Sequence, residues 1–103
     1  MKYLFLLMMV FPFYVDAEDW INVSDMSQLR WQMAPNGTVY FRNLDQFNPE
    51  ALACCYNYYI DTTTEAGKSA WSVILAKMAT SGRLILGVAN VKQAGPITYL
   101  GNW

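Results

Sequence analysis

The segment from Tyr56 to Val88 constrains the fold of this chain more than any other part of the sequence. It begins with the aromatic run Tyr-Asn-Tyr-Tyr-Ile-Asp, continues through three threonines and a mostly apolar stretch, and ends in Arg-Leu-Ile-Leu-Gly-Val. Runs of aromatic and β-branched residues favour strands, whereas a long apolar stretch between polar caps favours a helix. The segment therefore predicts a strand, a helix and a second strand in direct succession.

The helix is predicted to begin at Thr62 and to be largely enclosed. Thr62 followed by Glu65 fits a capping box, in which a hydroxyl and a carboxylate satisfy the first amides of the helix. Apolar residues cover most of its circumference and leave a narrow polar stripe, a pattern typical of a helix surrounded by other elements. Gly82 is placed to stop the helix, because glycine readily takes the left-handed conformation there.

Further strands are predicted on both sides of this segment. Gln28–Met33 alternates polar and apolar residues, and a Pro-Asn-Gly turn joins it to Thr38–Asn43 as a hairpin. Arg83–Ala89 carries an apolar run that predicts a strand buried on both faces, and Pro96–Asn102 is the last predicted strand. Trp20–Asp25 is a short lead-in that can form an edge strand.

With Cys54–Ile60 as the aromatic third strand, the predicted order is β-β-β-α-β-β. This order predicts a mainly β fold with one central helix, namely an OB-like five-stranded small barrel that the helix closes at one end. The alternative is an α+β sheet with one packed helix. The chain is short enough that we expect a single domain.

Residues 1–17 are expected to be a signal peptide. Lys2 supplies a positive charge, the apolar run Tyr3–Val15 is shorter than a membrane span, and Val15-Asp16-Ala17 fits a cleavage site. We therefore expect a secreted or periplasmic protein with one domain over residues 18–103 and no membrane span after cleavage. Cleavage would remove Lys2 and Asp16, so the 7 basic and 8 acidic residues of the chain would fall to 6 and 7. Neither the basic nor the acidic residues cluster in the sequence, which argues against nucleic-acid binding.

The sequence contains no histidine, the commonest general base at neutral pH. This removes Ser-His-Asp and Cys-His arrangements and histidine-ligated zinc, and two cysteines alone cannot complete a tetrahedral metal site. Carboxylate pairs such as Asp45 with Glu50, or Asp61 with Glu65, are explained by loops and helix capping. Gly67-Lys68-Ser69 lacks the first glycine of a phosphate-binding loop. We therefore expect no enzymatic activity, no cofactor and no metal.

A surplus of aromatic residues remains, because so small a core cannot enclose them all. On an alternating strand Tyr56 and Tyr58 point one way, and Asn57 and Tyr59 point the other, so one of these faces is expected on the surface. Together with Trp31 these side chains suit stacking on sugar rings and hydrogen bonding to hydroxyls, and they suit protein interfaces equally. These five residues are the predicted ligand-binding set.

The sequence YYIDTTTEAGKSAWSVILAKMATSGRLILGV, together with the closing GPITYLGNW, resembles small exported bacterial proteins of unknown function. More distantly, the layout is similar to the OB-fold binding subunits of pentameric bacterial toxins of the subtilase and pertussis type. The resemblance implies an OB-like fold whose outer surfaces and loops bind glycans. It also implies a disulfide from the third strand to the last loop, but this chain has no cysteine in its C-terminal region.

Cys54 and Cys55 are instead neighbours in the sequence. In an oxidising compartment they can form a vicinal disulfide, remain two reduced thiols, or bond to another molecule. Adjacent side chains on a strand point to opposite faces, so we expect one buried, inert thiol, with an intermolecular disulfide as the alternative.

The sequence as a whole thus predicts a non-catalytic exported binding module for a glycan or a protein. An open strand edge, which another copy can cover, favours a homo-oligomer. The alternative function is an envelope structural or inhibitor-type protein whose partner is a bacterial protein.

Overall fold

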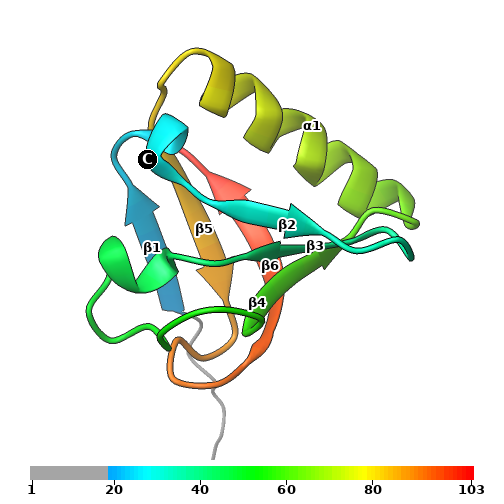
Figure 1. Cartoon of the computed structure of the whole chain (residues 1–103). Coiled ribbons are helices and arrows are strands. Elements are labelled where there is room, and N and C mark those ends of the chain that lie inside the picture. The colour runs from blue at the N-terminus through cyan, green and yellow to red at the C-terminus, as the bar shows by residue number, and fades with distance from the viewer. Residues whose placement is uncertain (1–18) are drawn as a thin grey trace, which may run out of the picture.

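The computed structural model describes residues 19–103, which form a mainly β structure with one helix (Figure 1). The predicted signal peptide, residues 1–17, lies outside the described residues and stays a prediction. The helix α1 spans Glu65–Ala79, and two 3-10 turns, η2 (Met26–Gln28) and η3 (Leu44–Gln46), lie in the connections. The strands are β1 Asp19–Val23, β2 Trp31–Met33, β3 Thr38–Phe41, β4 Tyr58–Asp61, β5 Leu84–Val88 and β6 Gly95–Gly101. No helix within residues 19–103 has both the length and the apolar character needed to cross a membrane.

The strands form one open six-stranded sheet in the order β1-β5-β6-β4-β3-β2. Neighbouring strands are antiparallel except β4 and β6, which run parallel. The predicted order β-β-β-α-β-β is confirmed from β2 to β6, and the lead-in Trp20–Asp25 contributes the edge strand β1. The prediction of a five-stranded barrel is wrong in strand number and in closure, because β1 and β2 occupy opposite edges of the sheet.

The connection between β1 and β2 turns at η2. Here the chain leaves the extended conformation: Asp25 caps η2 by accepting a hydrogen bond from the backbone N–H of Ser27 at 2.9 Å. The side chain of Met26 is fully buried, and its N–H donates to the carbonyl of Gly82 at 2.9 Å. These contacts hold the connection against the segment that follows α1.

The hydrophobic core lies on one face of the sheet. Strict alternation in β3 and β4 sends Val39, Phe41, Tyr58 and Ile60 into this core, together with residues of β1, β5 and α1. All five residues of β5 are buried, as predicted. β5 is flanked by β1 and β6, and on its outer side the Tyr99 ring fills the space that a side chain at Gly87 would need.

The helix α1 lies along the outside of the sheet and is much less enclosed than the sequence predicts (Figure 1). Only Gly67 and Ile74 are buried, whereas Val73 and Leu75 are 42% and 41% exposed. One side of the helix packs on η2 and β4, and the rest of a chain this short forms no second layer over the other side. The prediction of an enclosed helix that closes a barrel is therefore wrong.

Both ends of α1 also differ from the prediction. The N-cap is Thr64, whose hydroxyl accepts from the N–H of Gly67 at 2.9 Å, while the hydroxyl of Thr62 donates to the carbonyl of Gly37 in the β2–β3 turn. Each of three consecutive threonines could cap a helix, and the turn engages the first of them. At the other end Ser81, with φ of 55°, takes the left-handed conformation that we expected at Gly82.

Candidate functional site

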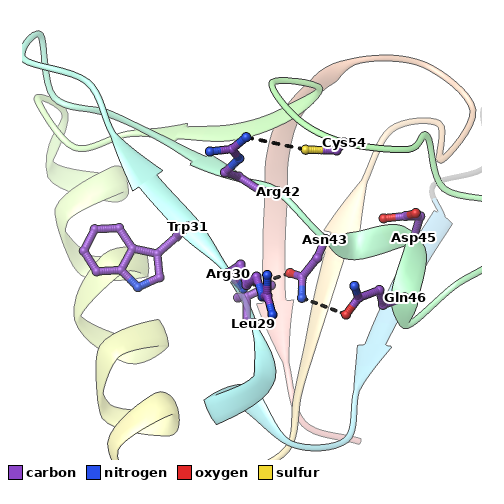
Figure 2. Close-up of a pocket in the computed structure, with 8 residues that line it drawn as sticks. All are labelled: Leu29, Arg30, Trp31, Arg42, Asn43, Asp45, Gln46 and Cys54. Carbon is purple, nitrogen blue, oxygen red and sulfur yellow. Dashed lines mark hydrogen bonds between the residues drawn. The ribbon is translucent and has the colours of Figure 1, made fainter.

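A polar pocket of about 670 Å³ opens beside β2 and β3 (Figure 2). Its lining comes from β2 and η3, from the residues that directly follow η2 and β3, and from the loop before β4. It is formed by Leu29, Arg30, Trp31, Arg42, Asn43, Asp45, Gln46 and Cys54. Two guanidinium groups, a carboxylate and two amides in one wall favour a ligand rich in hydrogen-bonding groups over an apolar one.

The side chain of Asn43 fixes the shape of this pocket. It is 4% exposed, and its Oδ1 accepts from the N–H of Arg30 at 2.8 Å. Its Nδ2 donates to the carbonyl of Gln28 at 2.9 Å and to Oε1 of Gln46 at 3.1 Å. The bonds to Arg30 and Gln46 are drawn in Figure 2. A single buried amide therefore holds residues 28–30 against η3, and the sequence analysis did not identify it.

Arg42 joins the pocket to an aromatic surface on the outer face of the sheet. Its Nη1 donates to Oε1 of Gln32 at 2.8 Å, and its Nη2 lies 3.7 Å from Sγ of Cys54. The guanidinium carbon lies 5.5 Å from the centre of the Tyr56 ring, within range of a cation–π interaction. Because several partners hold Arg42, its position beside Tyr56 is well defined.

Three tyrosines surround this contact. The rings of Tyr40 and Tyr56 meet edge-on at 5.2 Å between centroids, and Tyr40 and Tyr59 are tilted at 6.0 Å. The strand register explains their order, because Tyr40 pairs with Gln32 on β2 and with Tyr59 on β4. We call the surface made by Gln32, Tyr40, Arg42, Tyr56 and Tyr59 the tyrosine face.

The structure places the five predicted ligand-binding residues in different parts of the protein. Tyr56 and Tyr59 both belong to the tyrosine face, and Tyr56 is 56% exposed. Asn57 donates its amide to the carbonyl of Ala53 at 2.6 Å and so stabilises its own loop. Trp31 turns away from Arg42 toward α1 (Figure 2), where it meets Trp71 edge-on at 4.9 Å. Tyr58 is 1% exposed and is not available to a ligand.

The hydroxyl of Tyr58 is satisfied inside the protein. It accepts from the N–H of Leu52 at 2.7 Å and donates to the carbonyl of Val91. Burial raises the pKa of Tyr58 above its ordinary value, an effect that the bond from Leu52 partly offsets and the nearby charge of Asp45 adds to. The pairing of Tyr56 with Tyr58 on one face is wrong, because β4 begins only at Tyr58.

Cys54 and Cys55 are bonded to each other by a disulfide. Cys54 is exposed and Cys55 is half-buried, so the expectation of one buried thiol is wrong. Both residues precede β4 and lie in a bend, where the alternation of a strand does not apply. The intermolecular disulfide stays a prediction and would require this bond to open.

Gln32, Tyr40 and Arg42 are the functional candidates that sequence reasoning missed. The alternation in the predicted hairpin already placed Gln32 on the polar face of its strand. The structure pairs Gln32 with Tyr40, because three residues, 35–37, connect the strands. A two-residue Asn36-Gly37 turn would have aligned Gln32 with Phe41. Nothing in the sequence indicated that the loop before β4 brings Tyr56 back over Arg42.

The carboxylates considered earlier lie in different places. Asp45 lines the polar pocket, Asp61 lines a separate groove beside α1, and Glu50 lines neither. Hydrogen bonds from Thr63 lower the pKa of Asp61, which is consistent with a turn carboxylate. Within residues 19–103 no group of three or more His, Cys, Asp or Glu side chains is placed to hold a metal ion. The arrangement at the pocket is thus suited to stacking and hydrogen bonding.

The pocket and the tyrosine face together form the candidate functional site. The resemblance to exported bacterial proteins and toxin binding subunits stays a prediction from the sequence. Comparison of the chain with protein-family models, with curated proteins and with solved structures finds no match.

Proposed function

We propose that the protein is a non-catalytic exported module that binds a glycan across the tyrosine face and the adjoining polar pocket. The observation that carries this proposal is a row of tyrosine rings, Tyr59, Tyr40 and Tyr56, whose last member lies against a fixed Arg42–Gln32 pair. Sugar rings offer apolar C–H faces with hydroxyls at their edges. Such a ligand is matched by aromatic rings beside guanidinium and amide donors.

The preorganisation of this surface supports the proposal. Tyr40 and Tyr59 stand on paired strands, and Tyr56 is held by its ring contacts and by its hydroxyl, which donates to Gln32 at 3.4 Å. A ligand therefore meets side chains that are already ordered, so less conformational entropy is lost on binding. The adjoining pocket has the volume of a small-molecule site and supplies further polar groups.

The test is a glycan array followed by calorimetric titration with the strongest ligand. We expect Tyr56→Ala to weaken binding by about tenfold, since a stacked aromatic ring contributes on the order of 0.5–1.5 kcal/mol beyond the apolar area that it buries. Trp20→Ala is the matched control: Trp20 is 53% exposed against 56% for Tyr56, but it lies on β1 at the far edge of the sheet. The absence of binding to any glycan on the array, or an equal loss of affinity in the Tyr56→Ala and Trp20→Ala variants, would contradict the proposal.

We further propose that the sheet is an opened variant of the predicted OB-like layout. The strand order β5-β6-β4-β3-β2, with α1 between β4 and β5, supports this proposal. In this reading β1 and β2 are two halves of one first strand, separated at η2, that lie on opposite edges of the sheet.

A protein partner is the second candidate, and exposed apolar residues on β2 favour it. Trp31 and Met33 are 43% and 46% exposed, and β2 is an edge strand. Exposed apolar edges of this kind are typical of sites where another chain docks. We propose that a second copy covers β2, and a bacterial protein partner is the alternative.

A further inference from the structure

A second, apolar groove of about 490 Å³ runs between α1 and β6, apart from the proposed glycan site. Ile60 forms part of its floor, Ala70 and Val73 line it from the helix, and Ile97 and Leu100 line it from β6. The lining is mainly apolar, and Ile97 and Leu100 are only partly buried against the core. The groove therefore leaves apolar side chains accessible from outside.

The groove follows the edge of a strand. Five consecutive residues of β6, Pro96–Leu100, line it. A hollow over the face of a strand would meet only alternate residues, so consecutive residues indicate that the groove lies along the backbone edge. In the part of the chain that the structure describes, β4 pairs with β6 only through Gly95 and Pro96, although β6 continues to Gly101. Beyond Pro96 the two parallel strands separate.

The start of α1 keeps these strands apart. The helix begins soon after β4 ends at Asp61, and Gly67 packs directly on the carbonyl of Asp61. The first turn of α1 thus occupies the space through which β4 would have to continue beside β6. Ile97 and Thr98 line the groove just beyond the last residue of β6 that pairs with β4, and a strand edge at this point can accept another strand.

We propose that this groove binds an extended peptide segment of a protein partner, which adds a short strand to β6 and inserts alternate apolar side chains beside Val73. Backbone hydrogen bonds give affinity in this mode of recognition, and pockets for alternate side chains give specificity. Asp61 is the acidic residue among those that line the groove, and hydrogen bonds from Thr63 lower the pKa of its carboxyl, so it is negatively charged at neutral pH. The peptide accordingly carries a lysine or arginine at the end that lies beside Asp61.

The test is a titration of the ¹⁵N-labelled protein with the hexapeptide acetyl-Lys-Val-Thr-Val-Thr-Val-amide, followed by amide chemical shifts. We expect saturable shifts at residues 97–100 and along the 66–73 face of α1, and slower amide exchange in β6. The analogue with glutamate in place of lysine is expected to bind about tenfold more weakly, because it faces Asp61.

Two variants of the same helix provide the decisive control. Val73→Glu places a charge in the groove and is expected to weaken the affinity for the peptide by about tenfold or more. Leu75→Glu makes the same change at a residue of equal exposure that does not line the groove, and is expected to leave the affinity within about twofold. Both residues are exposed, so both variants are expected to fold.

Four outcomes would overturn the proposal. The first is the absence of saturable shifts in the groove with the lysine peptide, and the second is an equal effect of the two helix variants. The third is saturation of the groove by sodium dodecanoate but not by the peptide, which would make it a site for apolar small molecules. Shifts of the same residues on dilution of the free protein would assign the groove to a second copy and would also overturn it.

Discussion

At the scale of single residues, Tyr58 shows how one hydroxyl can connect distant parts of the chain. Its ring is in the core, its oxygen accepts from Leu52 in the loop before β4, and its proton goes to Val91 in the loop before β6. The two loops are thereby attached to the same strand. Removing the oxygen leaves both backbone groups without this partner.

We expect Tyr58→Phe to lower the free energy of unfolding by about 1–3 kcal/mol, the usual penalty for leaving buried polar groups unsatisfied. Tyr59→Phe is the matched control, because Tyr59 is the next residue on β4, points to the opposite face and is only half-buried. It should change the free energy of unfolding by less than about 0.5 kcal/mol. Urea denaturation of the three proteins measures the difference, and equal stability of both variants would contradict the role of Tyr58.

The same residue predicts a loss of stability in alkali. Because burial raises the pKa of Tyr58, an unfolded chain releases this proton at a lower pH than the folded protein does. The stability linked to this proton is complete below about pH 10 and declines as the pH rises through the folded-state pKa. Denaturation between neutral pH and pH 11 should show this decline, and Tyr58→Phe should reduce it. An unchanged decline in the variant would assign the effect to other groups.

Residue exposure could be predicted from the sequence only where a strand is regular. Alternation correctly places Gln32 on the outer face of the β2–β3 hairpin and makes Phe41 a core residue. It fails for Cys54 and Tyr56, because they lie in a bend whose path is set by contacts with Arg42 and not by local preference. Tyr56 was therefore predicted as a ligand-binding residue for the wrong reason, and its contacts with Tyr40 and Arg42 were not predicted.

At the scale of elements, the junction of β4 with α1 is the tightest contact in this part of the fold. A Cβ added at Gly67 would lie 1.8 Å from the carbonyl oxygen of Asp61, and backbone cannot move aside as a side chain can. Gly67 thus allows close packing at the helix start. The helix begins where it does because no side chain intervenes at this point.

We expect Gly67→Ala to destabilise the protein by about 1–3 kcal/mol, because overpacking outweighs the gain of about 1 kcal/mol that alanine brings to a helix. Ser69→Ala, two residues along on an exposed position, should instead be neutral or slightly stabilising. Thermal unfolding followed by circular dichroism compares them. A Gly67→Ala protein as stable as the parent would show that the helix start can shift without loss.

Elements themselves were predictable where the sequence has a clear period. The hairpin, the buried strand β5 and the last strand were all found, because alternation or an apolar run identified each of them. The surroundings of α1 were not, since an apolar helix can be covered by other elements or simply carry exposed alanines. Ala66, Ala76 and Ala79 are exposed, so the apolar circumference overstated how much of the helix is buried.

At the scale of the whole molecule, the open sheet leaves two edges of different character. At one edge all three residues of β2 are exposed, and the large apolar side chains of Trp31 and Met33 are among them. The other edge, β1, alternates buried and exposed residues, with Trp20 and Asn22 exposed. A second copy that covers β2 would remove the side chains of Trp31 and Met33 from water.

We expect the protein to be an oligomer by light scattering, and Met33→Lys to shift it toward the monomer, because a charge is placed in the apolar contact. Asn22→Lys, the same change on the β1 edge, should leave the mass unchanged. Reductant should have no effect if the cysteines are bonded to each other, as in the structure. A monomeric parent would contradict self-association. If reductant dissociated the oligomer, that result would support the alternative hypothesis of an intermolecular disulfide.

The order of the elements was predictable from local sequence, but the closure of the sheet was not. In the structure the residues between β1 and β2 turn at η2, where the N–H of Met26 donates to the carbonyl of Gly82 across a long stretch of sequence. No pattern within Ser24–Arg30 reports such a contact.

The alternation of β3 and β4 has a consequence for how such a protein can diverge. Val39, Phe41, Tyr58 and Ile60 maintain the fold, while the residues between them, Tyr40 and Tyr59, take no part in the core. Substitutions on one side of these strands can accumulate without disturbing the other. A lineage built on this scaffold is therefore free to change what it recognises while its architecture persists.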